Sequence, residues 1–141
     1  MIVYLDTSSL VKLYVKEDDS PHVVNLVEAS EITATSLIAY TESRAAFARR
    51  FREKAFSPSE YKRLVSFFDE DWEKYFVVNV TKNLVLMAGD LAEKHGLRGF
   101  DAIHLSSAVR LHQELSSPVT FSSADQRLQK ASALEELHQP N

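Results

Sequence analysis

The fold is decided by the first stretch of the chain, Met1-Ile-Val-Tyr-Leu-Asp-Thr-Ser-Ser-Leu-Val-Lys-Leu-Tyr14. Its apolar run at residues 2–5 has the length of a buried strand. Asp6 and the three hydroxyl residues after it suit the N-terminus of a helix, and the apolar spacing that follows predicts that helix. The stretch therefore predicts a strand, a turn and a helix, with a carboxylate at the carboxyl end of the strand.

The alternation of strand and helix patterns continues along the chain. Apolar runs predict three further strands, at residues 31–36, 76–80 and 119–121. Helical spacing fills the intervals, and the helices expected over residues 37–56 and 57–75 should pair as a hairpin. Strands that alternate with helices predict an α/β domain with a mostly parallel sheet, because parallel neighbours need long crossover connections.

The amino-acid composition limits the classes of protein to which this chain could belong. The 141 residues, 45% hydrophobic and 26% charged, fit one domain over residues 1–141. Cysteine is absent, which excludes disulfides and thiolate metal sites, so a metal would need oxygen or imidazole ligands. No leader-like or bilayer-length apolar segment is present, and we expect a cytoplasmic protein with no membrane partner. The net charge of −4 does not exclude RNA, because cations bound among clustered carboxylates would offset their charge.

Four acidic residues occupy positions that suit metal-dependent phosphodiester hydrolysis. Asp6 and Asp125 each follow a predicted strand, Asp101 opens a helical pattern, and Glu42 lies within another. If the first and fourth strands are neighbours, their carboxyl ends and both aspartates meet in one crevice, where ligands of parallel sheets bind. Carboxylate oxygens are the ligands that Mg²⁺ and Mn²⁺ prefer, and such ions leave positions open for water and phosphate.

Each acid also has a plain structural explanation. Asp6 and Asp101 could be N-caps of the helices that follow them, and Asp125 could be a turn residue. Glu42 could lie on an exposed, salt-bridged helix face. His104, one helical turn after Asp101, is better explained as a packed histidine that hydrogen-bonds to a neighbouring element, so we leave it out of the catalytic set.

Four motifs together resemble the PIN-domain ribonucleases, and in particular the VapC toxins of bacterial and archaeal type II toxin–antitoxin pairs. They occur in the family's order and cover nearly the whole chain. The motifs are YLDTSSLVKLY at residues 4–14, YTESR at 40–44, GFDAIHLSSA at 99–108 and FSSADQRL at 121–128.

The resemblance implies a three-layer α/β/α sandwich with a parallel sheet in the order 3-2-1-4-5, Mg²⁺-dependent endonucleolytic cleavage of RNA, frequent homodimers, and inhibition by a cognate VapB-like antitoxin. It also implies that Asp6, Glu42, Asp101 and Asp125 form the acidic set, with Ser123 and either Thr7 or Ser8 as hydroxyl support. One departure concerns residues 134–138, which predict a helix or tail where the family has its fifth strand.

We therefore hypothesise an endoribonuclease in which Asp6, Asp101 and Asp125 hold one or two Mg²⁺ or Mn²⁺ ions and metal-activated water attacks phosphorus. Glu42 would ligate directly or through water and orient the nucleophile. Two alternatives stay open. One is a degenerate PIN module that binds RNA or protein without cutting. The other is a phosphatase of the haloacid dehalogenase type, which needs a second acid at the position of Ser8.

Two surface features have more than one interpretation. Arg44, Arg49 and Arg50 belong to a basic stretch that could contact RNA phosphates or an acidic antitoxin segment, or could simply be solvated. The aromatic residues of the expected hairpin could pack its two helices together or form a groove for a partner helix or dimer mate. The RNA that is cut, the number of ions and the oligomeric state are not readable from the sequence.

Overall fold

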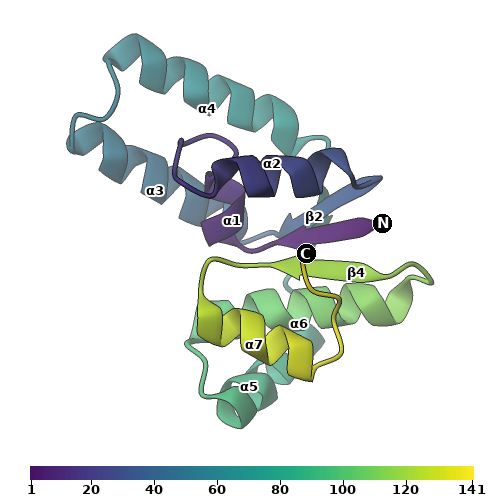
Figure 1. Ribbon diagram of the computed structural model, residues 1–141. Coiled ribbons are helices and arrows are strands. Elements are labelled where there is room, and N and C mark those ends of the chain that lie inside the picture. The colour runs from purple at the N-terminus through teal and green to yellow at the C-terminus, as the bar shows by residue number, and fades with distance from the viewer.

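A computed structural model describes residues 1–141 and contains four strands and seven helices in alternation (Figure 1). The predicted α/β class is confirmed. In chain order the elements are β1 (Ile2–Leu5), α1 (Thr7–Val11), α2 (Ser20–Glu28), β2 (Ile32–Ser36), α3 (Ala39–Arg52), α4 (Pro58–Trp72), β3 (Phe76–Val78), α5 (Lys82–His95), α6 (Gly99–Glu114), β4 (Val119–Ser122) and α7 (Gln126–Leu134).

The four strands form one parallel sheet in the order β3-β2-β1-β4. β1 is central, and its Tyr4 lies beside Ala34 of β2 and Phe121 of β4. The first and fourth strands are therefore neighbours, as the convergence of Asp6 and Asp125 requires. The predicted order is confirmed for these four strands.

The fifth strand of the family pattern is reduced to a single parallel bridge between Thr120 and His138. His138 donates its N–H to the carbonyl of Val119 at 3.0 Å and accepts the N–H of Phe121 at 2.9 Å. The segment before it turns at Glu136, which has a φ of 68°, and Leu137 is its one buried side chain. This segment does not form a longer strand because it has only one apolar residue to bury against the sheet.

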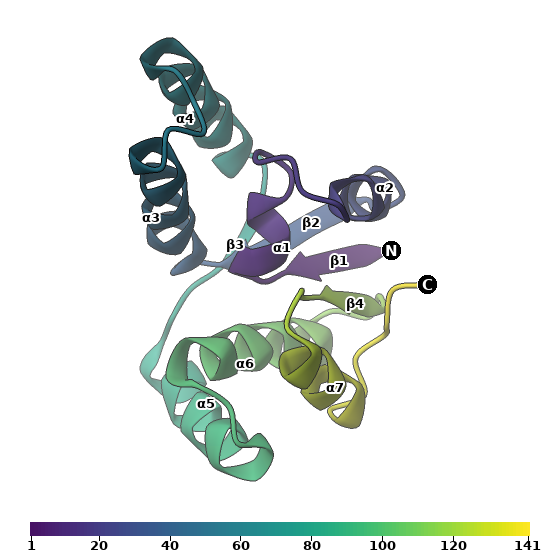
Figure 2. The same ribbon diagram turned by 60° about the vertical axis from the view of Figure 1, so that its left-hand side comes forward.

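The sheet lies between two helical layers (Figure 2). Successive side chains of β1 point to opposite faces, as strand geometry requires. Ile2 and Tyr4 pack in the core beneath α5, α6 and α7. Val3 and Leu5 pack in the second core, which α1, α2, α3 and α4 cover. The three-layer sandwich is confirmed, and β1 is buried on both faces.

The predicted hairpin of α3 and α4 is confirmed, and aromatic side chains hold it together. Phe47 and Phe68 are fully buried, and their ring centroids lie 5.2 Å apart. Ser57 and Glu60 form a reciprocal capping box that begins α4. Phe67 is different, because it is 54% exposed and helps to line a hollow of about 270 Å³ between α1 and α4.

The α6 helix is the most enclosed helix of the structure, as its apolar sequence predicts. Seven of its residues are buried, and they include polar as well as apolar side chains: Ala102, His104, Leu105, Ser106, Ser107, Ala108 and Leu111. None of the helices combines the length and apolar character that crossing a bilayer requires.

Candidate active site

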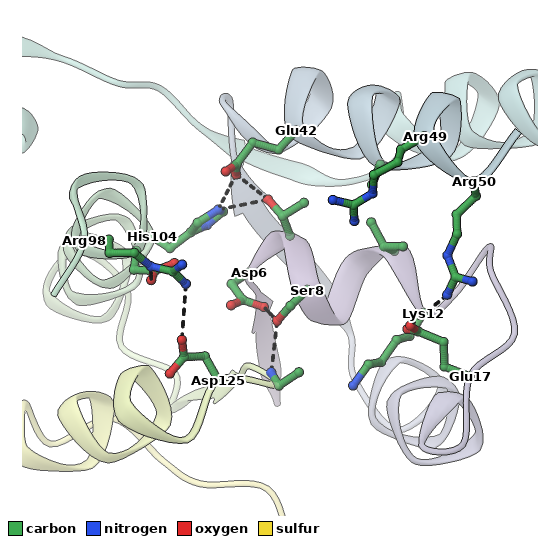
Figure 3. Close-up of a pocket in the computed structure, with 15 residues that line it drawn as sticks. Asp6, Ser8, Lys12, Glu17, Glu42, Arg49, Arg50, Arg98, His104 and Asp125 are labelled. Carbon is green, nitrogen blue, oxygen red and sulfur yellow. Dashed lines mark hydrogen bonds and ion pairs between the residues drawn. The ribbon is translucent and has the colours of Figure 1, made fainter. Parts of the chain in front are cut away.

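A cavity of about 570 Å³ opens at the carboxyl ends of the strands, and all four predicted acids line it (Figure 3). They come from four separate segments: the β1–α1 junction, α3, the first turn of α6, and the N-terminus of α7. The lining is strongly polar, since only three of its fifteen residues are hydrophobic. The structure thus brings together Asp6, Glu42, Asp101 and Asp125, which the sequence places far apart.

Asp6 is the most deeply buried of these acids, with an exposed fraction of 3%. Its Oδ1 accepts the N–H of Ser9 at 3.0 Å and the hydroxyl of Ser8 at 2.7 Å, so it does cap α1. Its Oδ2 accepts the hydroxyl of Ser123 at 2.6 Å. Burial raises the pKa of Asp6, although the electrostatic effect of His104 and these hydrogen bonds offset part of the rise. No lysine or arginine pairs with this carboxylate.

Asp125, like Asp6, caps a helix with one carboxylate oxygen and makes a separate contact with the other. Its Oδ1 caps α7 by accepting the N–H groups of Arg127 at 2.9 Å and Leu128 at 3.1 Å, while its Oδ2 faces Arg98. Ser123 links the two strand-end acids, because its Oγ donates to Asp6 and accepts the N–H of Asp125 at 3.0 Å. The capping explanation is therefore correct for Asp6, and Asp125, which the sequence suggested as a turn residue, is also an N-cap. Each still turns its second oxygen away from the helix it caps.

Asp101 does not cap its helix, so that alternative is wrong. The α6 helix begins at Gly99, and Arg98 occupies the N-cap position without a side-chain capping bond. Asp101 lies in the first turn, where a negative charge is favoured by the helix dipole. Its Oδ2 accepts the Nε–H of Arg98 at 3.1 Å, and its side chain is 22% exposed.

Glu42 is held by a chain of hydrogen bonds that reaches into the core. Its Oε1 accepts the hydroxyl of Thr7 at 2.5 Å and lies 3.0 Å from Nε2 of His104. Nδ1 of His104 in turn lies 2.8 Å from the hydroxyl of Tyr4. Burial alone would raise the pKa of Glu42, but the bonds from His104 and Thr7 outweigh it and hold the pKa below its ordinary value.

The partners of His104 define its neutral tautomer. The Thr7 hydroxyl is already used as a donor to Glu42, and the carboxylate can only accept, so Nε2 must carry a proton to satisfy both neighbours. If the ring is neutral, Nδ1 is then an acceptor, and the fully buried Tyr4 hydroxyl, 2.8 Å away, is its donor. The sequence-based interpretation of a packed, hydrogen-bonded histidine is confirmed, and the structure adds that its polar edge lines the cavity.

The basic residues of α3 separate into two groups. Arg49 and Arg50 line the cavity, and Figure 3 shows both reaching from α3 on the side opposite Arg98. Arg50 pairs with Glu17 at 3.2 Å, whereas Arg49 has no hydrogen-bonded or ionic partner. The structure does not bring Arg44 to the cavity, because its guanidinium is engaged with the ring and hydroxyl of Tyr40.

Sequence reasoning missed two cations of this cavity. Arg98 precedes Asp101 by three residues and contacts both Asp101 and Asp125. Lys12 is buried, and it forms an ion pair with Asp19. Neither residue belongs to a recognisable pattern, since a single arginine or lysine at a helix boundary is common. Only the three-dimensional arrangement identifies them.

The donor set suits a hard divalent cation. Asp6, Asp101 and Asp125 supply only oxygen ligands, which Mg²⁺ and Mn²⁺ prefer. Asp6 is a buried carboxylate without a cationic partner, an arrangement that a bound cation would relieve. As the side chains lie, no three acidic or histidine groups are close enough to hold an ion together, and the guanidinium of Arg98 contacts two of the acids.

Comparisons with known proteins agree with the fold. The family described as PIN domain matches residues 3–134. Ribonuclease VapC49 from Mycobacterium tuberculosis (strain ATCC 25618 / H37Rv) is 36% identical over 112 residues, which cover 77% of this chain and 75% of that relative.

Two solved structures share the fold at lower identity. A toxin–antitoxin complex from Klebsiella pneumoniae aligns with a TM-score of 0.59 and 18% identity, over 84% of this chain and 83% of that chain. VapBC2 from Rickettsia felis, solved with a DNA fragment from its promoter, aligns with a TM-score of 0.64 and 16% identity, over 99% and 97%. At these identities the likeness concerns the fold alone.

Proposed function

The chain belongs to the PIN-domain family, and we propose that it is the ribonuclease toxin of a VapBC-type toxin–antitoxin pair, which hydrolyses phosphodiester bonds within RNA with a divalent cation. The observation that carries this proposal is the convergence of four carboxylates from four separate segments in one polar cavity. A relative with 36% identity that is named a ribonuclease supports the same reaction.

The metal site consists of Asp6, Asp101 and Asp125, with Asp6 at its buried end. A Mg²⁺ or Mn²⁺ ion bound there supplies positive charge to the phosphoryl oxygens and lowers the pKa of an attacking water. The chain itself fixes the ligands, because capping bonds orient Asp6 and Asp125 and Ser123 sets the distance between them. Such outer hydrogen bonds set the direction of ligating carboxylates.

Glu42 orients the attacking water. Its Oε1 is occupied by Thr7 and His104, while its Oε2 has no partner within the protein and can accept a proton from water in the cavity. The lowered pKa keeps this carboxylate ionised, and only the ionised form can accept that proton. His104 and Thr7 act as positioning residues, because they touch Glu42 rather than the reacting atoms.

The charges that line the cavity favour phosphate only after a cation has bound. Five carboxylates face four cationic side chains, so the formal charge of the lining is −1 without an ion and +1 with one divalent ion. Arg49 lacks a partner and is the side chain best placed to contact the RNA backbone, with Arg50 beside it. The residues counted are Asp6, Glu17, Glu42, Asp101, Asp125, Lys12, Arg49, Arg50 and Arg98.

The protein partner is a cognate VapB-like antitoxin. Support comes from structures that share the fold and are named as toxin–antitoxin or VapBC assemblies. The hollow beside Phe67, lined by apolar side chains of α4 and of the segment that follows α1, is a surface of the kind on which an amphipathic partner helix packs.

The phosphatase alternative lacks a residue that it requires. Ser8 stands where the second acid would be, and its hydroxyl donates to Asp6. A degenerate binding module would be marked by the loss of a core acid, and all four acids are present in the cavity.

The proposed function is tested by incubating the purified chain with a pool of tRNA, rRNA and mRNA in Mg²⁺, in Mn²⁺ and in EDTA. We expect discrete fragments in the presence of either metal and none in EDTA. Intact RNA after incubation with metal and antitoxin-free protein would contradict the proposal and favour a binding module.

A further inference from the structure

Arg98 is the cation that lies among the metal-site acids. Its Nε–H donates to Oδ2 of Asp101 at 3.1 Å, and its Nη2–H reaches Oδ2 of Asp125 at 3.5 Å (Figure 3). The two carboxylates lie at the N-termini of different helices, α6 and α7, and no other lysine or arginine side chain pairs with either of them. The arginine side chain is 80% exposed, whereas the side chains of Asp101 and Asp125 are 22% and 34% exposed.

Local helix chemistry does not explain this arginine. Arg98 is the N-cap residue of α6, where a side-chain acceptor is favoured and a positive charge is opposed by the helix dipole. It makes no capping bond. What the position does provide is reach to both carboxylates, which would otherwise repel each other across the cavity in the absence of a cation.

We propose that Arg98 is a positioning residue that holds Asp101 and Asp125 in the metal-free protein through the oxygens that the metal uses, and that it moves onto the RNA phosphate when a divalent cation takes its place. Only the movement of Arg98 onto the RNA phosphate rests on the proposed function. Two observations support the proposal: the guanidinium contacts an Oδ2 atom of each of two proposed metal ligands, Asp101 and Asp125, and the exposed arginine side chain is free to swing toward solvent.

This arrangement has opposite consequences for metal binding and for catalysis. Removing the guanidinium releases two carboxylates and removes a like charge beside the cation, so metal affinity increases. Removing it also takes away a fork-shaped donor that suits phosphate oxygens, so cleavage slows. A residue with a merely structural role would impair both properties or neither.

The test is a titration of RNA-free wild type and Arg98→Gln with Mn²⁺, in which electron paramagnetic resonance measures the concentration of the free ion. We expect the variant to bind Mn²⁺ about three- to tenfold more tightly, the range for release from two exposed ion pairs. Arg98→Lys should lie between them, because it keeps the charge and loses the fork. Arg52→Gln is the matched control, since Arg52 lies exposed on α3 outside the cavity.

If Arg98→Gln binds Mn²⁺ as tightly as wild type or more weakly, Arg98 does not compete with the cation for the carboxylates, and the proposal is overturned. Circular dichroism of the same samples verifies that the variant is folded. The proposed movement of Arg98 onto the RNA phosphate is tested by single-turnover cleavage at saturating Mn²⁺, where Arg98→Gln should cleave RNA at least about tenfold more slowly than wild type. If wild type cuts no RNA, the proposed function fails while the Mn²⁺ comparison still stands. Tighter binding with an unchanged cleavage rate would overturn the transfer to phosphate.

Discussion

The two halves of the active-site cavity are held in different ways. In the first half, Asp6 and Glu42 are fixed by hydroxyl and imidazole groups, among them Thr7, Ser123 and His104. In the second half, Asp101 and Asp125 share one exposed cation, Arg98. The difference suggests that the half with Asp6 and Glu42 sets geometry before any ligand arrives, and that the half with Asp101 and Asp125 adapts when the cation and RNA arrive.

The largest effect is expected from Asp6→Asn, which removes the charge of the buried aspartate in the first half of the cavity. Cleavage should fall by roughly 1,000-fold or more, because the cation loses its buried ligand. Asn is also a good N-cap, so α1 is preserved. The variant is assayed on RNA beside Asp18→Asn, which alters an exposed aspartate outside the cavity.

The thermal stability of Asp6→Asn tests whether Asp6 is a ligand or a structural group. The raised pKa of Asp6 means that the folded protein disfavours the ionised form, so its contribution to stability is greatest at acidic pH and is lost as pH rises through the raised pKa. In EDTA at neutral pH, thermal denaturation should show a midpoint equal to or above that of wild type. A large loss of stability would show that Asp6 is a structural group rather than a strained ligand.

The next effect concerns the chain of hydrogen bonds behind Glu42. His104→Gln should lower cleavage about 10- to 100-fold, the usual cost of removing a group that orients a catalytic carboxylate. Single-turnover kinetics on saturating RNA measure this effect. His112→Gln on the same helix is the control, since Nδ1 of that histidine is buried without a partner and lies outside the cavity. Equal losses in both variants would point to packing of α6 alone.

A smaller effect is expected at the rim of the cavity. Arg49→Gln should weaken binding to uncleaved RNA several-fold and lower the slope of affinity against salt by about one unit, because one phosphate contact is lost. Arg44→Gln should leave that slope unchanged, since its guanidinium is engaged with Tyr40. Binding is measured at several salt concentrations with the Asp6→Asn protein. Identical slopes for both arginine variants would remove Arg49 from the RNA interface.

The smallest effect is a pH-dependent one at Thr7. The lowered pKa of Glu42 gives stability that is present above the pKa of an unfolded glutamate and is lost as pH falls through the folded value. Thr7→Val removes one of the bonds that lower this pKa and should cost about 0.5–1.5 kcal/mol at neutral pH. Urea denaturation in EDTA should show this cost shrinking below about pH 4. A cost that does not vary with pH would assign it to packing.

Much of this arrangement could be predicted from local sequence patterns. The run at Ile2–Leu5 gave the central strand, Asp6 gave the cap after it, and the neighbouring places of the first and fourth strands followed from parallel topology. Asp6 and Asp125 were found because carboxylates at strand ends are costly without a purpose, whereas Glu42 and Asp101 lie in helical patterns and were supported by the resemblance to the PIN family. Their roles as metal ligands remain a prediction, as does the organisation of residues 1–141 as one domain.

The remaining features depend on contacts between distant segments. Nothing in the sequence near Arg98 shows that α6 and α7 begin side by side, so its bridge to Asp125 could not be predicted. The pairing of Tyr4 with His104 spans 100 residues. Arg44 and Arg49 looked equivalent on a helix pattern, and only the structure separates them, because Arg44 is engaged with Tyr40 of the same helix while Arg49 lines the cavity.

The central claim is that a cation held by the buried aspartate drives RNA cleavage in this cavity. It is tested most directly by the single-turnover cleavage rate of one labelled RNA, measured against Mn²⁺ concentration for wild type and Asp6→Asn. The account predicts a rate that rises to saturation with Mn²⁺ in wild type and a rate that is roughly 1,000-fold lower in the variant at the same Mn²⁺ concentration. Cleavage by wild type in EDTA, or a dependence of the rate on Mn²⁺ that is the same in Asp6→Asn as in wild type, would contradict it.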